Sequence, residues 1–148
     1  MPTDKSAQKT NGTDNIQDIL KSSLARLQNV DNVLFTCVVD ARGEVVDSYG
    51  GLEESKLRAY AAMCATIFGA NRKANDELNI DPPSIIISND SAGKNYIKGL
   101  GRSYILVART KRGNNYDEIE KTVEKEGNLL TQKWLRNYLM TSLKKKYK

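Results

Sequence analysis

The sequence predicts a single α+β domain whose elements follow the order helix, two strands, helix, three strands, helix. Three observations support this prediction. The chain has 148 residues, a common length for one domain. Apolar residues recur at helical spacing in three segments. Between these segments lie short apolar runs that are bounded by turn-forming residues, which is typical of strands.

The composition excludes several classes of protein. A chain with 39% hydrophobic residues is too apolar to be wholly disordered. No run of even ten apolar residues occurs, which excludes a membrane-spanning helix, and the polar first twelve residues lack a signal peptide. We therefore expect a cytoplasmic protein. Cys37 and Cys64 lie in apolar segments and are expected to be buried, reduced thiols.

The sequence contains no histidine, which removes Ser-His-Asp catalysis, His-ligated zinc and the commonest general base. We expect no catalytic residue, no cofactor and no metal site. The net charge of +5 is unevenly distributed, because six bases and no acid occur from Thr131 onward. The nearly neutral body makes nucleic acid an unlikely partner. We expect a disordered tail at residues 1–12, a domain at 13–130 and a basic amphipathic extension at 131–148.

The first helix is expected at about residues 14–28, where Asp14 and Gln17 have the spacing of a capping box. Its apolar face consists of Ile16, Ile19, Leu20, Leu24 and Leu27. The β-branched run at 33–39 predicts a strand that is buried on both faces. A tight turn from Asp40 to Gly43 and a return strand at 44–49 complete a hairpin.

A longer helix is expected at about residues 53–78, and it carries two apolar stripes. One stripe contains Leu57, Tyr60, Ala61, Cys64 and Phe68, and the other contains Ala59, Ala62, Met63, Ile67, Ala70 and Ala74. The helix could lie deep in the core of one subunit, or its small-residue stripe could meet a partner helix. We favour the second alternative, because alanines let helices approach closely and the chain has few elements to cover another face.

The prolines at 82 and 83 prevent the long helix from continuing. Strands are expected at 84–89, at 94–100, which is weaker and polar, and at 103–108. The last helix begins near Tyr116 with acidic residues in its first turn. Its apolar pattern allows it to continue past Gly127 through Leu130, Trp134, Leu135, Tyr138, Leu139 and Leu143.

Residues 39–50, VDARGEVVDSYG, combine a strand, an Asp-x-x-Gly turn, a second strand and a Ser-x-Gly ending. The alanine-rich helix and a three-strand meander follow. In this order, from about residue 15 to 130, the chain resembles a roadblock/dynein-light-chain domain. The resemblance implies a roadblock/profilin-like, three-layer α/β/α sandwich with a five-stranded antiparallel sheet. The middle helix would cover one face, and the first and third helices would cover the other.

The resemblance also implies a function, that of a non-catalytic homodimeric adaptor or regulator. Roadblock domains bind small Ras-like GTPases and pair through the middle helix and the strand after it. The interface residues expected here are Ala59, Ala62, Met63, Thr66, Ala70, Ile85, Ile86 and Ile87. Further partner contacts are expected at Arg58, Arg72, Lys73 and Trp134.

Two alternative functions remain open at this point. The amphipathic extension with its run of lysines could tether the protein to an anionic membrane surface, or Trp134 and its neighbours could pack back on the domain. The chain could also be a light-chain-like structural subunit of a larger complex. Arg109, Lys111 and Arg112 could offer an arginine to the nucleotide site of a partner, but a solvated loop is expected there.

Overall fold

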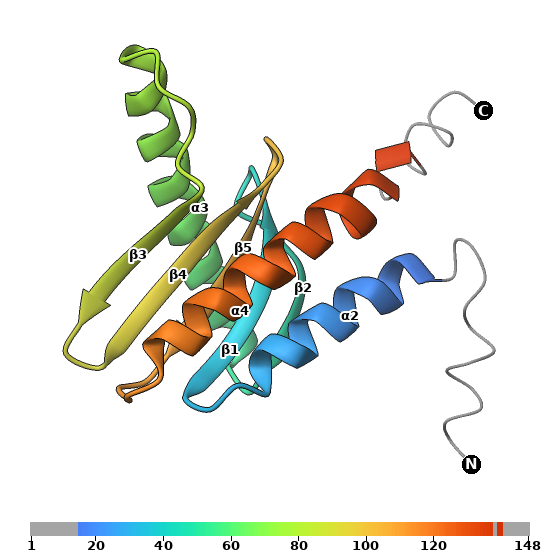
Figure 1. Cartoon of the computed structure of the whole chain (residues 1–148), viewed down its shortest axis with the longest axis vertical. Helices are drawn as coiled ribbons and strands as arrows, with labels where there is room; N and C mark the ends of the chain where they lie inside the picture. Colours follow the sequence, from blue (N-terminus) through green and yellow to red (C-terminus); the bar gives the residue numbers. More distant parts are fainter. Residues whose placement is uncertain (1–14, 138, 141–148) are drawn as a thin grey trace.

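A five-stranded antiparallel sheet forms the middle layer of the protein in a computed structural model that describes residues 15–137, 139 and 140 (Figure 1). The strand order is β2-β1-β5-β4-β3. The helices are α2 (Asn15–Gln28), α3 (Glu54–Glu77) and α4 (Tyr116–Leu129), and α4 runs into the π-helical segment η2 (Leu130–Leu135). The strands are β1 (Val33–Asp40), β2 (Val45–Gly50), β3 (Ile85–Asp90), β4 (Gly93–Leu100) and β5 (Tyr104–Thr110).

Helices cover both faces of this sheet, as Figure 1 shows, with α2 and α4 side by side on one face and α3 on the other. Each face has its own hydrophobic core. The core under α2 and α4 includes Leu20, Leu24, Val38, Leu106 and Ile119. The core under α3 includes Phe35, Cys37, Leu57, Phe68 and Val107. The predicted α+β class, the element order and the three-layer sandwich are confirmed.

The predicted turn at Asp40 and a second hairpin turn at Asp90 both form, and each is closed by an aspartate. The Asp40 carboxylate accepts hydrogen bonds from the backbone N–H groups of Arg42 and Glu44, at 2.9 and 3.0 Å. The Asp90 carboxylate accepts hydrogen bonds from the N–H groups of Ala92 and Gly93. In the first turn Gly43 has a φ of +90°, which a residue with a side chain rarely adopts. These turns fix the register of β1 with β2 and of β3 with β4.

Strand β4 differs from the expectation of a weak, polar strand, because it is among the most buried strands. It lies between β3 and β5, so helices on both faces cover its polar residues. The Asn95 amide donates a hydrogen bond to the Cys64 sulfur at 3.7 Å. The Lys98 stem packs against Gly127, where an added Cβ would lie 2.8 Å from the lysine Cγ. The polar composition of this segment therefore led to the wrong expectation of a weak strand, whereas β4 is a buried strand inside the sheet.

The last helix continues past Gly127, as predicted, and residue 130 falls within continuous helical backbone. Trp134 is completely buried and makes an edge contact with Tyr104 at 5.6 Å between ring centroids. Leu135 is also buried, whereas Leu139 is exposed. The predicted roles of residues 1–12, Tyr138, Leu143 and the terminal lysines lie outside the described residues. Within the described segments, no helix combines the length and apolar character that crossing a bilayer requires.

Candidate protein-binding surface

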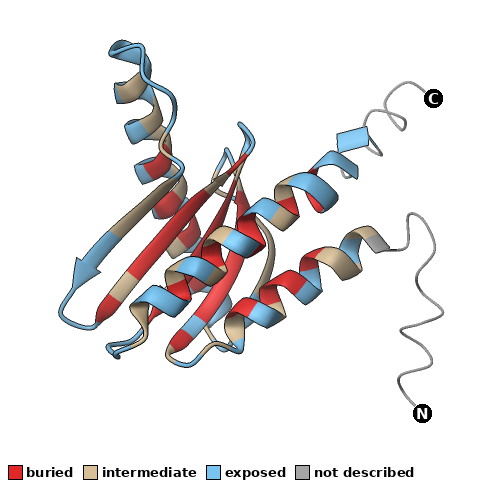
Figure 2. Cartoon of the chain, in the orientation of Figure 1, coloured by how far each residue is buried: buried red, intermediate tan, exposed pale blue. Residues whose placement is uncertain are grey.

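The long helix α3 has one buried side and one bare side. Leu57, Ala61, Cys64 and Phe68 point into the core of the sheet face that α3 covers. The opposite stripe is exposed, and Figure 2 shows exposed and buried residues alternating along the helix. Its exposed members are Ala59, Ala62, Met63, Thr66, Ile67, Ala70 and Ala74. The alternative in which α3 lies deep in the core of one subunit is therefore wrong.

Large apolar side chains stand on this bare side. Met63 is 65% exposed and Ile67 is 43% exposed, although both occupy the middle of a 24-residue helix. Ala62 lies on the flank toward the β1–β2 turn, because an added Cβ on Gly43 would lie 3.1 Å from the Ala62 Cα. The helix thus offers a surface of small and apolar residues, which is typical of a protein-binding site.

Strand β3 adds an open sheet edge to the surface. Among the described residues it pairs only with β4, so its outer backbone groups have no strand partner. The three expected interface residues of this strand are half-buried. Ile86 packs against the core under α3, whereas Ile85 and Ile87 pack against the core under α4. Edge strands with apolar side chains commonly pair with another chain.

Two residues that the sequence analysis did not single out extend the apolar surface beyond the end of α3. Leu78 is 67% exposed and Ile80 is 53% exposed. Between them Asn79 adopts a left-handed conformation with a φ of 58°. The sequence signal was available, since an asparagine that ends a helix with apolar residues on both sides indicates a capping turn.

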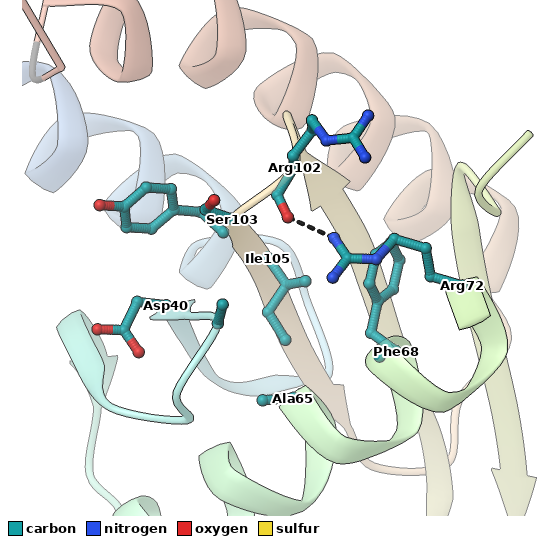
Figure 3. A pocket seen from close by; sticks show the side chains of 10 residues that line it. Asp40, Ala65, Phe68, Arg72, Arg102, Ser103 and Ile105 are labelled. Carbon is teal, nitrogen blue, oxygen red and sulfur yellow. Dashed lines mark hydrogen bonds between the residues drawn. The ribbon is translucent and has the colours of Figure 1, made fainter. Parts of the chain in front are cut away.

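The four expected partner contacts are not equivalent in the structure. Arg58 and Lys73 are exposed on α3. Arg72 is half-buried and donates a hydrogen bond to the carbonyl of Arg102, as Figure 3 shows. This contact borders a cavity of about 40 Å³ between α3 and the β4–β5 turn, too small for a nucleotide. Trp134 is buried and presents no contact surface, which corrects the expectation for that residue.

Arg109 lies at the end of strand β5 rather than in a solvated loop. Its guanidinium binds both carboxylate oxygens of Asp90 at 2.8 Å, and only 14% of its side chain is exposed. The hydrogen bond from Arg109 is the main cause that holds the pKa of Asp90 well below its usual range. The pair spans β4 and fastens the end of edge strand β3 to β5. Lys111 and Arg112 are exposed, as expected.

The two cysteines are buried under α3, as predicted. Burial raises the pKa of the Cys37 thiol to about 12 and that of the Cys64 thiol to about 11. Both thiols therefore stay protonated near neutral pH and are weak nucleophiles. In the part of the chain that the structure describes, no three Cys, Asp or Glu side chains gather as metal ligands would.

Solved structures with this fold include bacterial proteins of low sequence identity. Myxococcus xanthus MglB has a TM-score of 0.75 and 16% identity, over 82% of this chain and 91% of that chain. The gliding protein MglB from Thermus thermophilus has a TM-score of 0.71 and 13% identity, over 82% and 91%. A Roadblock/LC7 domain from Streptomyces avermitilis has a TM-score of 0.69 and 15% identity, over 80% and 96%.

No curated protein sequence matches the chain. The family profile described as the Roadblock/LC7 domain matches residues 19–108, which is more than half of the chain. The matched segment runs from α2 through most of β5 and contains α3 and all of β3. The chain therefore belongs to the Roadblock/LC7 domain family.

Proposed function

We propose that the protein forms a homodimer through α3 and β3, and that this dimer binds a small Ras-like GTPase as a non-catalytic adaptor or regulator. The observation that carries the proposal is the bare apolar side of α3 beside an open sheet edge. Membership of the Roadblock/LC7 family supports both the mode of pairing and the class of partner.

The dimer has a physical rationale in the two kinds of surface that it would cover. Burying apolar area yields about 25 cal/mol per Å², and Met63 and Ile67 are both exposed in one subunit. Alanines at 59, 70 and 74 leave room for a second helix to approach closely. Pairing β3 with a second β3 would also satisfy the free backbone groups of that edge.

The other edge strand, β2, is a poorer candidate for pairing. Its side chains include Asp47, which is already bound by Lys21 of α2 at 3.0 Å. Strand β3 instead begins with three consecutive isoleucines, all half-buried. Apolar edge residues that one subunit covers incompletely gain more from a partner than charged residues that are already paired.

Symmetry determines how two copies would meet. For α3 and β3 both to contact their own equivalents, the two-fold axis must stand perpendicular to the sheet, beside β3. The two β3 strands are then antiparallel, and both α3 helices lie on the same face of a joined sheet. Paired α3 helices would form a platform that one subunit alone lacks.

The exposed cations Arg58 and Lys73 lie on α3 and would remain on the surface of this platform. They suit the recognition of an acidic patch on the GTPase and would raise the rate of association. Any effect on GTP hydrolysis would come from positioning the GTPase's own switch residues.

The dimer is tested by measuring solution mass by light scattering for the wild type and for Met63→Glu. We expect a wild-type dimer and a monomeric variant, because an unpaired carboxylate in a dry helix contact is costly. Ser55→Glu, also exposed on α3, is the matched control and should remain dimeric. A monomeric wild type would contradict the proposal.

Partner binding is tested with Ras-like GTPases from the same genome, each loaded with GDP or with a non-hydrolysable GTP analogue. We expect one of them to bind the wild-type dimer with a preference for one nucleotide state. Arg58→Glu combined with Lys73→Glu should keep the dimer and weaken binding about tenfold at low salt. If binding is unchanged in both this variant and Met63→Glu, the α3 platform is not the binding site.

The membrane alternative is less well supported. Of the apolar residues expected to face a membrane, Trp134 and Leu135 are buried in the domain. The light-chain-like alternative predicts co-purification with a protein other than a GTPase at fixed stoichiometry, which the same binding experiments would reveal.

A further inference from the structure

A small cavity lies where α3 meets the β1–β2 and β4–β5 turns. It has a volume of about 40 Å³, and its apolar lining includes Phe68 and Ile105. Arg72 of α3 stands at one side, where its guanidinium is hydrogen-bonded to the carbonyl of Arg102, and Asp40 lies at the other side (Figure 3). The cavity therefore combines apolar walls with a cation that the fold holds in place.

The positive charge of Arg72 is not neutralised within the part of the chain that the structure describes. No carboxylate there forms an ion pair with its guanidinium. The Asp40 carboxylate already accepts hydrogen bonds from the N–H groups of Arg42 and Glu44, and in Figure 3 it points away from Arg72. A guanidinium has five N–H donors, so Arg72 keeps donors for another acceptor after it has bound one carbonyl.

Gly69 lines the same cavity and is not explained by packing. It lies in the interior of α3, where glycine is less favourable than alanine. An added Cβ at Gly69 would meet no atom within 4 Å, whereas one at Gly99 would lie 2.8 Å from the Phe68 ring. A glycine that neither the helix nor its neighbours require indicates that the space above it is kept open for another molecule.

The size and lining of the cavity indicate the chemistry of the group that would enter it. About 10–15 Å³ is needed for each water-sized group, so a volume of about 40 Å³ holds about three of them. This matches a carboxylate, whereas a phosphate is larger. A guanidinium can bind a carboxylate through two parallel hydrogen bonds, and apolar walls strengthen the attraction by excluding water.

The cavity stays open in the proposed dimer. Residues two positions apart on a helix point about 200° apart, so Ala65 and Gly69 lie on the flank of α3 away from Met63 and Ile67. Arg58 lies on the same flank as Gly69, because eleven residues make about three turns. The cavity and the exposed cation at Arg58 therefore border one surface.

We propose that this cavity anchors an aspartate or glutamate side chain of the GTPase, whose carboxylate binds Arg72 beside Gly69. The inference rests on the proposed function and adds to it a site of defined size and charge. A carboxylate held in this cavity is screened less by salt than one that meets the exposed Arg58 or Lys73, so the anchor contributes to binding at high salt as well.

Sodium acetate is the first probe, because it reproduces the end of an aspartate side chain and needs no GTPase. It is titrated into the full chain and followed by NMR, with sodium chloride at equal ionic strength as the reference. We expect saturable shifts of the Arg72 guanidinium and the Gly69 amide in the millimolar range, as suits so small a ligand. Sodium phosphate should give no saturable shift.

Two variants connect the cavity with the partner. Gly69→Met would cover the cavity, and Arg72→Gln removes the cation. Each should keep the dimer, lose the acetate response and bind the GTPase about tenfold more weakly. Gly69→Met leaves the Arg72 side chain in place and improves the helix propensity, so its melting temperature should be no lower than that of the wild type. Asn128→Met, exposed on α4, is the matched control and should bind normally.

The outcomes separate the anchor from the function on which it rests. Absence of saturable acetate shifts, or tighter binding of phosphate, would overturn the carboxylate site. Unchanged GTPase binding by Gly69→Met would also overturn the anchor, while the proposed function would stand. If no GTPase binds the wild type, the proposed function and the GTPase as source of the carboxylate both fall, although saturable acetate shifts would still establish a carboxylate site.

Discussion

The two helical layers of this protein differ in how completely one chain builds them. The layer of α2 and α4 is closed within the subunit, because the Glu126 carboxylate accepts hydrogen bonds from Ser23 at 2.6 Å and from Arg26 at 2.9 and 3.0 Å. Trp134 fills the space beyond these helices. Within the described part of the chain, the layer on the other face is the helix α3 alone, and Met63 and Ile67 are exposed on it.

This difference distinguishes the layer that contacts within the subunit stabilise from the layer that leaves an apolar surface for a partner. The hydrogen bonds of Glu126 and the buried indole of Trp134 stabilise the first layer, so its core side chains do not need a second protein to cover them. In the second layer one side of α3 is buried against the sheet, and the other side is exposed and available to a second protein. Substitutions in the two layers should therefore affect different measurements, namely folding in the first and assembly in the second.

The largest effect is expected for Trp134→Ala in the closed layer. Truncating a fully buried aromatic side chain leaves a cavity and should cost about 3–5 kcal/mol of unfolding free energy. The measurement is chemical denaturation at low protein concentration. Leu139→Ala, at an exposed position of the same helix, is the control and should change the free energy by about 0.5 kcal/mol or less. Equal losses for both would mean that the helix end does not pack on the domain.

A smaller effect is expected for Glu126→Gln, which weakens the link between α2 and α4. The loss should be about 1–3 kcal/mol near neutral pH, because Arg26 and Ser23 lose a charged acceptor in a buried place. Burial alone would raise the pKa of Glu126, but the hydrogen bonds from Arg26 and Ser23 outweigh it and hold the pKa below its usual value.

That direction determines the pH dependence. A carboxylate whose folded pKa is depressed stabilises the protein above its unfolded pKa of about 4.3, and this contribution is lost as the pH falls through the folded value. The unfolding free energies of the wild type and of Glu126→Gln should therefore begin to converge as the pH falls below about 4.3. A constant difference down to the acid limit would show that the effect is one of packing and not of charge.

The smallest effect on the isolated subunit is expected for Ile67→Ser on the bare side of α3, about 0.5 kcal/mol or less in dilute solution. The wild-type melting temperature should rise with protein concentration, since association stabilises the folded state by mass action. The variant should lose most of that rise. A wild-type melting temperature that does not depend on concentration would remove the distinction between the two layers.

Much of the fold could be predicted from local sequence because each element carries its own signal. The aspartate turn at Asp40 lies at the predicted position, and α3 begins and ends within about a residue of its expected bounds. The candidate surface was partly predictable as well, since the stripe of Ala59, Met63 and Ala70 is visible as helical spacing. The burial of β4 was not predictable in this way, and the sequence left open whether Trp134 packs back on the domain, because both depend on segments distant in the sequence.

By itself, the sequence determined the order of the elements, their turns and the presence of two apolar stripes on one helix, because these depend on residues within one or two turns of each other. Only the tertiary structure decided which stripe is bare, that Arg109 binds Asp90 across β4, and that Trp134 faces inward. Those outcomes depend on which distant segments share the two faces of the sheet. Among the residues that the structure describes, two helices cover one face and α3 alone covers the other, and the outer surface of α3 remains exposed for that reason.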